Sequence, residues 1–66
     1  MSGIILDLVK FLKDAGYSSV AENVLDGATR ADELRKLQDD GSVLTEQETD
    51  FLKQQDTFEA NLRTLS

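Results

Sequence analysis

The side chains of this sequence that could do chemistry are mainly carboxylates, and they gather around one glycine. Asp39-Asp40-Gly41-Ser42, followed by Glu46 and Glu48, contains the residue types of a helix–loop–helix calcium site. Such a loop needs alternating oxygen ligands before its glycine and a bidentate Glu six residues after it. Here only two adjacent acids precede the glycine, and the sixth residue after it is Gln47. The spacing therefore favours a polar turn between helices, and we expect no metal site.

Catalysis has few candidate residues in this chain. There is no histidine and no cysteine, which removes the commonest general base near neutral pH and the thiolate nucleophile. Paired carboxylates transfer protons only in a cleft that raises the pKa of one of them. A helical chain of 66 residues has little room for a ligand pocket of about 300–1,000 Å³. We therefore expect no enzyme activity, no cofactor and no small-molecule substrate.

The charge of the chain narrows the classes of partner. Thirteen acidic and seven basic residues give a net charge of −6, which disfavours binding to nucleic acid or to an anionic membrane. The apolar run from Ile4 to Leu12 is interrupted by Asp7 and Lys10, so it does not resemble an export signal. No stretch approaches the roughly 18 apolar residues of a membrane span. A cytoplasmic protein is the expectation.

The small size of the chain predicts that it needs a partner. Residues 1–66 are expected to form a single small helical domain. Below roughly 70–80 residues, one core seldom supplies more than about 3–5 kcal/mol, and small folds usually add a disulfide, a metal or another chain. Because cysteine and histidine are absent, packing against another chain is the most available of these.

Glycines and capping residues predict where the helices begin and end. Gly16, Gly27 and Gly41 each follow a stretch with helical spacing of apolar residues, as expected of glycines that stop helices. With Gly16 as the left-handed stop, Leu12 and Tyr17 become the pair expected in a Schellman motif. Three Ser/Thr-x-x-acid boxes predict helix starts: Ser19 with Glu22, Thr29 with Asp32, and Thr45 with Glu48.

These signals predict an all-α fold of four short helices, about 4–15, 19–26, 30–39 and 45–64, with helical hairpins packed into a homo-oligomeric bundle. The last helix carries an apolar stripe with a seven-residue spacing: Leu44, Phe51, Phe58 and Leu65, with Leu62 beside them. At 20 residues this helix would be about 30 Å long, more than the short second and third helices can cover. Part of the stripe is therefore expected to project or to pair with a second chain. The sequence leaves open whether this last helix packs in cis or in trans.

Residues 4–25 resemble a known dimerisation motif. Phe11-Leu12, three residues, Gly16-Tyr17, two residues, Val20-Ala21 and then Val24-Leu25 match the spacing of the LisH motif. Val20 stands where that motif usually has Thr. The resemblance implies a helical hairpin that homodimerises. The residues that it would place at the dimer interface are Ile4, Ile5, Leu8, Phe11, Leu12, Val20, Ala21 and Val24.

Residues 34–53 resemble a second family, the SHOCT-type short helical hairpin. The matching positions are Leu34, Leu37, Asp40, Gly41, Leu44, Thr45, Glu46, Glu48 and Lys53. One extra residue follows the glycine, and Thr49 replaces the usual aromatic residue.

The prediction for function is a self-associating protein–protein interaction module, an adaptor or regulatory subunit whose partners are itself and another protein. The predicted interface residues are Ile4, Ile5, Leu8, Phe11, Leu12, Tyr17, Val20, Val24, Leu44, Phe51, Phe58, Leu62 and Leu65. One alternative is an acidic inhibitor, phage-type or antitoxin-like, that masks a basic surface of a nucleic-acid-binding or toxin partner. Its exposed acids would be Asp32, Glu33, Asp39, Asp40, Glu46, Asp50, Asp56 and Glu59. A structural component of a larger assembly is the third hypothesis.

Overall fold

The chain folds into three helices, where the capping signals predict four. In the computed structural model, which describes residues 3–65, α1 spans Gly3–Asp14, α2 spans Ser18–Asp39 and α3 spans Glu46–Leu65. Those residues contain no strand. The all-α prediction is therefore confirmed, and so are the first and last helices, to within one residue at each end. The division of the middle segment into helices 19–26 and 30–39 is wrong.

The 22-residue helix α2 passes through Gly27 without interruption. A glycine inside a helix costs only about 1 kcal/mol, and Ala28 and Ala31 beyond it are strong helix formers that become buried. Thr29 does not cap a new helix, because its hydroxyl donates a 2.9 Å hydrogen bond to the carbonyl of Leu25 one turn earlier. This bond is typical of a threonine in the interior of a helix. Burial of the alanine side of α2 therefore outweighs the local stop signal.

The other two glycines do end helices, as predicted. Gly16 has φ +90° and Gly41 has φ +91°. After α1, the amide of Gly16 donates to the carbonyl of Lys13 at 3.1 Å and that of Tyr17 donates to Leu12 at 2.8 Å. After α2, the amides of Gly41 and Ser42 repeat the same pattern. Both stops are Schellman motifs, in which a left-handed residue allows two carbonyls of the last helical turn to accept hydrogen bonds from the amides that follow.

The start of α2 differs from the prediction because of the first of these turns. Tyr17 ends the Schellman motif and is already the N-cap of α2, with no side-chain capping bond. The helix therefore begins at Ser18, and Ser19 lies inside its first turn, two residues after the N-cap position. The Ser19–Glu22 box and the Thr29–Asp32 box are both wrong.

The predicted box at the start of α3 is confirmed. The amide of Thr45 donates to a carboxylate oxygen of Glu48 at 2.9 Å, and the amide of Glu48 donates to the Thr45 hydroxyl at 3.1 Å. These bonds satisfy two amides that the helix leaves without partners. The backbone N–H of Thr45, and then its hydroxyl, lowers the pKa of Glu48 below the ordinary value of 4.5.

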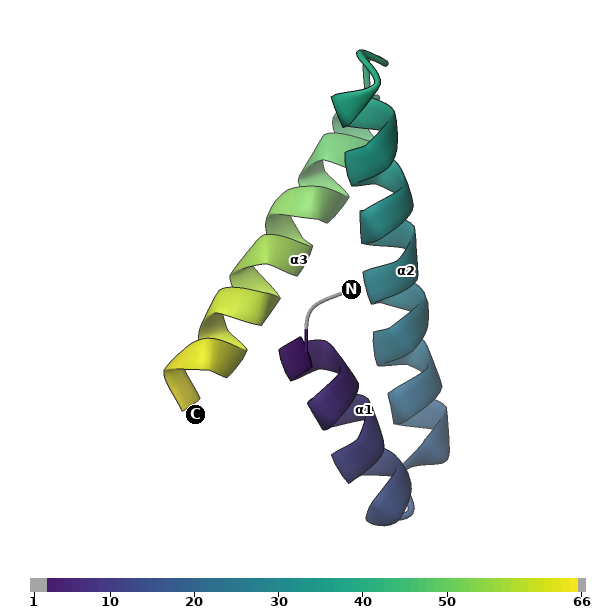
Figure 1. Ribbon diagram of the computed structural model, residues 1–66, viewed down its shortest axis with the longest axis vertical. Coiled ribbons are helices and arrows are strands. Elements are labelled where there is room, and N and C mark those ends of the chain that lie inside the picture. Colours follow the sequence, from purple (N-terminus) through teal and green to yellow (C-terminus); the bar gives the residue numbers. More distant parts are fainter. Residues whose placement is uncertain (1–2, 66) are drawn as a thin grey trace.

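Helices α2 and α3 join at a turn and separate toward their other ends, and α1 lies in the wider part of the opening (Figure 1). Two apolar clusters follow from this arrangement. The hairpin core, between α1 and α2, is formed by Ile5, Val9, Ala21 and Ala28, with Leu62 of α3 packed against it. The turn core, between α2 and α3, is formed by Ala31, Leu34 and Leu52, with Leu44 and Phe51 against it.

Both clusters are small. Of the seven buried apolar residues, three are alanines, and Ile5 is the largest side chain that is fully buried among the described residues. Burial of apolar area supplies roughly 25 cal/mol per Å², so short side chains contribute little. The single chain therefore has the thin core that its length predicts.

Alanine substitution of two glycines tests the continuity of α2. Gly27→Ala should raise the free energy of unfolding by roughly 0.5–1 kcal/mol, because the helix interior favours alanine over glycine. An added Cβ would lie 3.6 Å from Oε1 of Gln55, an ordinary contact. Gly16→Ala should lower stability by about 1–2 kcal/mol, because its φ is left-handed. Urea unfolding followed by circular dichroism, at one protein concentration, measures both. A loss of stability in Gly27→Ala would mean that this glycine ends a helix after all.

The capping box predicts a dependence of stability on pH. Because folding lowers the pKa of Glu48, its contribution is present above the unfolded value of about 4.5 and is lost as the pH falls through the lower folded value. Glu48→Gln should therefore be less stable than the natural chain at pH 7, and the difference should shrink below about pH 4.5. Urea midpoints of the two proteins between pH 7 and pH 3 give this comparison. A difference that stays constant with pH would contradict the role of the carboxylate.

Candidate interaction surface

Aromatic side chains lie at the surface of this protein instead of in its core. The chain has four, and three of them are partly or largely in solvent: Phe11 is 67% exposed, Tyr17 is 60% exposed and Phe58 is 36% exposed. The fourth, Phe51, is half-buried against the turn core, and the guanidinium of Arg30 lies 5.9 Å from the centre of its ring. Aromatic residues are enriched at protein–protein interfaces relative to other surfaces, so their exposure points to such a surface.

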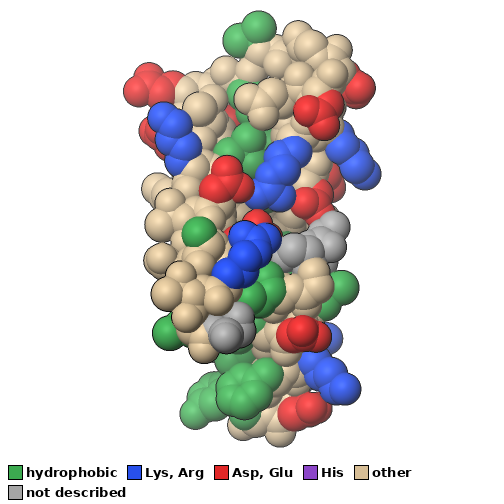
Figure 2. Space-filling model, turned by 60° about the vertical axis from the view of Figure 1, so that its left-hand side comes forward, with side chains coloured by type: hydrophobic (Ala, Val, Ile, Leu, Met, Phe, Trp, Pro, Cys, Tyr) green, Lys and Arg blue, Asp and Glu red, His purple; other side chains and the backbone are tan. Residues whose placement is uncertain are grey.

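The turn between α1 and α2 brings several of these exposed side chains to one end of the molecule. Phe11 is in the last turn of α1, Tyr17 is in the Schellman turn, and Val20 is in the first turn of α2. All three are exposed, and we refer to them together as the apolar end. Hydrophobic side chains gather at this end of the space-filling view (Figure 2). The left-handed Gly16 makes this placement possible, because it reverses the chain within a few residues.

The remaining predicted interface residues are distributed over the whole helical unit. Ile5 is fully buried in the hairpin core. Among the predicted interface residues of α1 and α2, four are half-buried: Ile4, Leu8, Leu12 and Val24. Along the apolar stripe of α3 and the turn before it, Leu44, Phe51 and Leu62 are half-buried and pack in cis, whereas Phe58 and Leu65 are exposed. The structure thus divides the stripe into a part that packs within the chain and a part that remains at the surface.

Sequence reasoning missed the residues of α3 that point most directly into the molecule. Leu52 and Glu59 are the buried residues of this helix, and each directly follows a phenylalanine of the stripe. Successive residues of a helix are 100° apart, so the stripe lies at one edge of the buried face. Sequence reasoning also missed three exposed apolar side chains: Leu6, Leu37 and Val43. The exposure of Val43 could have been predicted from the capping pattern, because Val43 lies in the turn between the Gly41 stop and the Thr45 cap.

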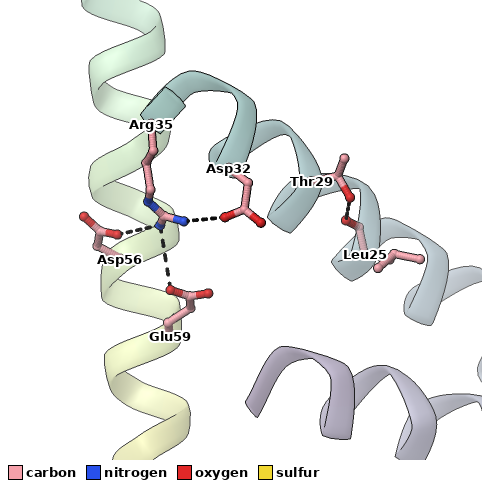
Figure 3. Close-up of polar contacts among 6 residues, drawn as sticks. All are labelled: Leu25, Thr29, Asp32, Arg35, Asp56 and Glu59. Atoms are coloured by element: carbon pink, nitrogen blue, oxygen red, sulfur yellow. Dashed lines mark hydrogen bonds and ion pairs between the residues drawn. The ribbon is translucent and has the colours of Figure 1, made fainter. Parts of the chain in front are cut away.

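A polar cluster joins α2 to α3, and Arg35 is its centre (Figure 3). The guanidinium donates to Asp32 at 3.0 Å and to Asp56 at 2.8 Å, and it lies 3.7 Å from a carboxylate oxygen of Glu59. The hydrogen bond to Asp56 raises the pKa of Arg35 above its usual range. Glu59 is only 8% exposed, so its predicted place among the exposed acids is wrong, because the cation on α2 draws it into the contact. Asp32, also predicted among the exposed acids, is half-buried and pairs with Arg35 within α2.

The net charge of the chain is concentrated at the turn between α2 and α3. Five acids and no basic residue occur in residues 37–50, which therefore hold −5 of the net −6. The acids are Asp39, Asp40, Glu46, Glu48 and Asp50. We call this region the acidic end. It lies at the opposite end of the molecule from the apolar end (Figure 1).

The described residues offer little to other kinds of site. No pocket is found among them, and none of their His, Cys, Asp or Glu side chains form a group of three or more that could hold a metal ion. Asp39 and Asp40 close the last turn of α2 ahead of Gly41. No helix within residues 3–65 is long and apolar enough to cross a membrane.

Removal of Arg35 tests whether the polar cluster holds α3 in place. Arg35→Met keeps the apolar stem but takes away a cation that lies close to the buried Glu59, so stability should fall by about 1–3 kcal/mol. Adding Glu59→Gln should restore part of the loss, because the second change removes the buried charge. The control is Lys36→Met at the exposed neighbouring position, where a change within about 0.5 kcal/mol is expected. Urea unfolding measures all three, and equal effects of Arg35→Met and Lys36→Met would contradict the role of Arg35.

Comparison with known proteins gives no relative from which to transfer a function. The chain matches no protein-family model, no curated protein and no solved structure.

Proposed function

We propose that this protein is a small self-associating interaction module, an adaptor or regulatory subunit whose copies meet through the apolar end. The observation that carries the proposal is the joint exposure of Phe11, Tyr17 and Val20 at one turn. Burial of a large apolar side chain contributes about 1.5–3 kcal/mol of free energy. Each aromatic side chain that stays in water loses this contribution. In interfaces, such residues form the buried centre that supplies most of the binding energy.

The overall dimensions support the proposal. The chain exposes 4788 Å², whereas a compact monomer of its 7.3 kDa mass would expose about 4,200 Å². Its radius of gyration is 12.8 Å, against about 10.8 Å for a compact domain of this length. The single chain is thus more open than a typical small domain, as expected of a protomer that leaves surface for a partner to cover.

The charge around the apolar end also supports self-association. Residues 8–24 contain two acids and two basic residues, so they carry no net charge. Two copies can approach there without electrostatic repulsion, and burial of apolar surface is the main source of affinity. Such an association should persist at high salt, because salt screens charges but does not weaken apolar burial.

The acidic end favours a second candidate function, an inhibitor that masks a basic surface on another protein. Asp39, Asp40, Glu46 and Asp50 are all exposed there. Binding through such acids should weaken as salt rises, since the Debye length is about 8 Å at 0.15 M. The third hypothesis, a structural component of a larger assembly, uses the same apolar end against a different protein.

Substitution at the apolar end tests the first candidate. Phe11→Asp should raise the dissociation constant of the homo-oligomer by roughly a hundredfold or more, because each of two protomers loses the burial of a phenylalanine. The helical content should stay the same, since Phe11 is 67% exposed in the single chain. The matched control is Val43→Asp in the turn at the acidic end, where the natural side chain is 97% exposed. Sedimentation equilibrium at low and high salt, with circular dichroism, measures both variants.

The outcomes separate the candidates. A species larger than a monomer that survives high salt and is lost in Phe11→Asp, but not in Val43→Asp, supports self-association through the apolar end. A folded monomer at all concentrations would overturn the proposal. Asp39→Lys combined with Asp40→Lys should leave the self-association intact, whereas it should abolish the binding of a basic partner to the acidic end.

A further inference from the structure

We infer that two copies of this chain meet end to end, apolar end against apolar end, so that the two acidic ends point away from each other. This inference rests on the proposed function and specifies its geometry. The second copy is the occupant of the apolar end. The inference depends on three features of the protomer: where its exposed apolar side chains lie, where its charge lies, and how much surface it leaves uncovered.

The exposed apolar side chains favour one half of the molecule. Phe11, Tyr17 and Val20 lie at the turn between α1 and α2. Phe58 and Leu65 lie in the C-terminal half of α3, which extends away from the acidic end and toward the level of α1 (Figure 1). A contact centred on the apolar end can include them. The exposed Leu37 and Val43 lie instead among the acids of residues 37–50.

The distribution of charge determines which ends can meet. A contact between two acidic ends would bring together two regions that each carry a net charge of −5, and like charges across an interface oppose association. A contact between two apolar ends joins regions without net charge, because residues 8–24 are balanced. Electrostatics and apolar burial therefore favour the same orientation.

The protomer exposes more surface than a compact chain of its mass, so it has area that a second copy can cover. The 4788 Å² that the chain exposes exceeds the area expected for a compact monomer by about 600 Å², and a standard interface covers about 800 Å² of each partner. Because the same patch is used by both copies, the contact is closed by a two-fold axis and stops at two copies. An end-to-end dimer is therefore expected, and no larger species.

Distances between two labels, one on each copy, test this geometry. The chain has no cysteine, so one substitution gives one site for a nitroxide spin label. Ser18→Cys places the label at the first residue of α2, beside the apolar end, and Ser42→Cys places it in the turn at the acidic end. Both serines are exposed, so the two variants are matched. Sedimentation equilibrium first establishes that each labelled protein still forms the dimer, and Asp14→Cys replaces Ser18→Cys if that label blocks the contact.

Pulsed dipolar spectroscopy should give a short distance for the Ser18 pair and a longer one for the Ser42 pair. The latter should exceed 39 Å, the longest dimension of one protomer. Two short distances would indicate a parallel side-by-side dimer, and two long distances an antiparallel one. A long Ser18 distance with a short Ser42 distance would mean that the acidic ends meet. Each of these three patterns, or a species larger than a dimer, overturns the end-to-end arrangement but leaves self-association standing. A monomer at every concentration overturns both.

Discussion

The packing of three helices around the alanine side of α2 is the constraint on which the rest of the structure depends. Ala21, Ala28 and Ala31 are buried along one uninterrupted helix. Small side chains let neighbouring helices approach closely, so α1 can pack against the first half of α2 and α3 against the second half (Figure 1). The same choice of residues limits the apolar area that folding removes from water. A continuous α2 thus gives the chain its shape and also leaves it with a thin core.

The contact between α2 and α3 combines a small apolar cluster with charged groups. Leu52 packs in the turn core, whereas Glu59, about two turns further along α3, meets Arg35. Arg35 is partly exposed and only Glu59 is buried, so the ion pair adds little stability compared with apolar packing, but it restricts which arrangements of the two helices leave the buried carboxylate paired. The contacts of Arg35 therefore position α3. In this position the phenylalanine stripe lies at the edge of the contact between α2 and α3.

That placement of α3 has consequences for the surface. Phe58 and Leu65 remain exposed on the side of the stripe that α2 and α1 do not cover, and the apolar end remains exposed at the turn between α1 and α2. The charge that keeps such a surface soluble is placed elsewhere, at the acidic end. Separation of apolar surface from net charge is what allows one end to associate and the other to stay in water or to meet a basic partner.

Local signals in the sequence determined a large part of this architecture. Gly16 and Gly41 end helices because only glycine adopts the left-handed conformation readily, and Thr45 with Glu48 starts a helix because both side chains reach backbone amides within one turn. These interactions are complete within six residues, so no other part of the chain can easily overrule them. The apolar character of the α1–α2 segment, with Phe11 and Tyr17 near its turn, is likewise visible in the sequence.

Tertiary structure decided the features that local signals leave open. Gly27 and Thr29 carry the same signals as a real helix boundary, and only the burial of Ala28 and Ala31 against α1 and α3 makes the helix continue through them. The seven-residue spacing showed that α3 has an apolar stripe, but not which side of it faces the molecule. Leu52 faces inward because it packs with Ala31 in the turn core, and Glu59 faces inward because it meets Arg35 on the neighbouring helix. Such choices depend on contacts between residues that are more than twenty positions apart in the chain, and no spacing within one helix records them.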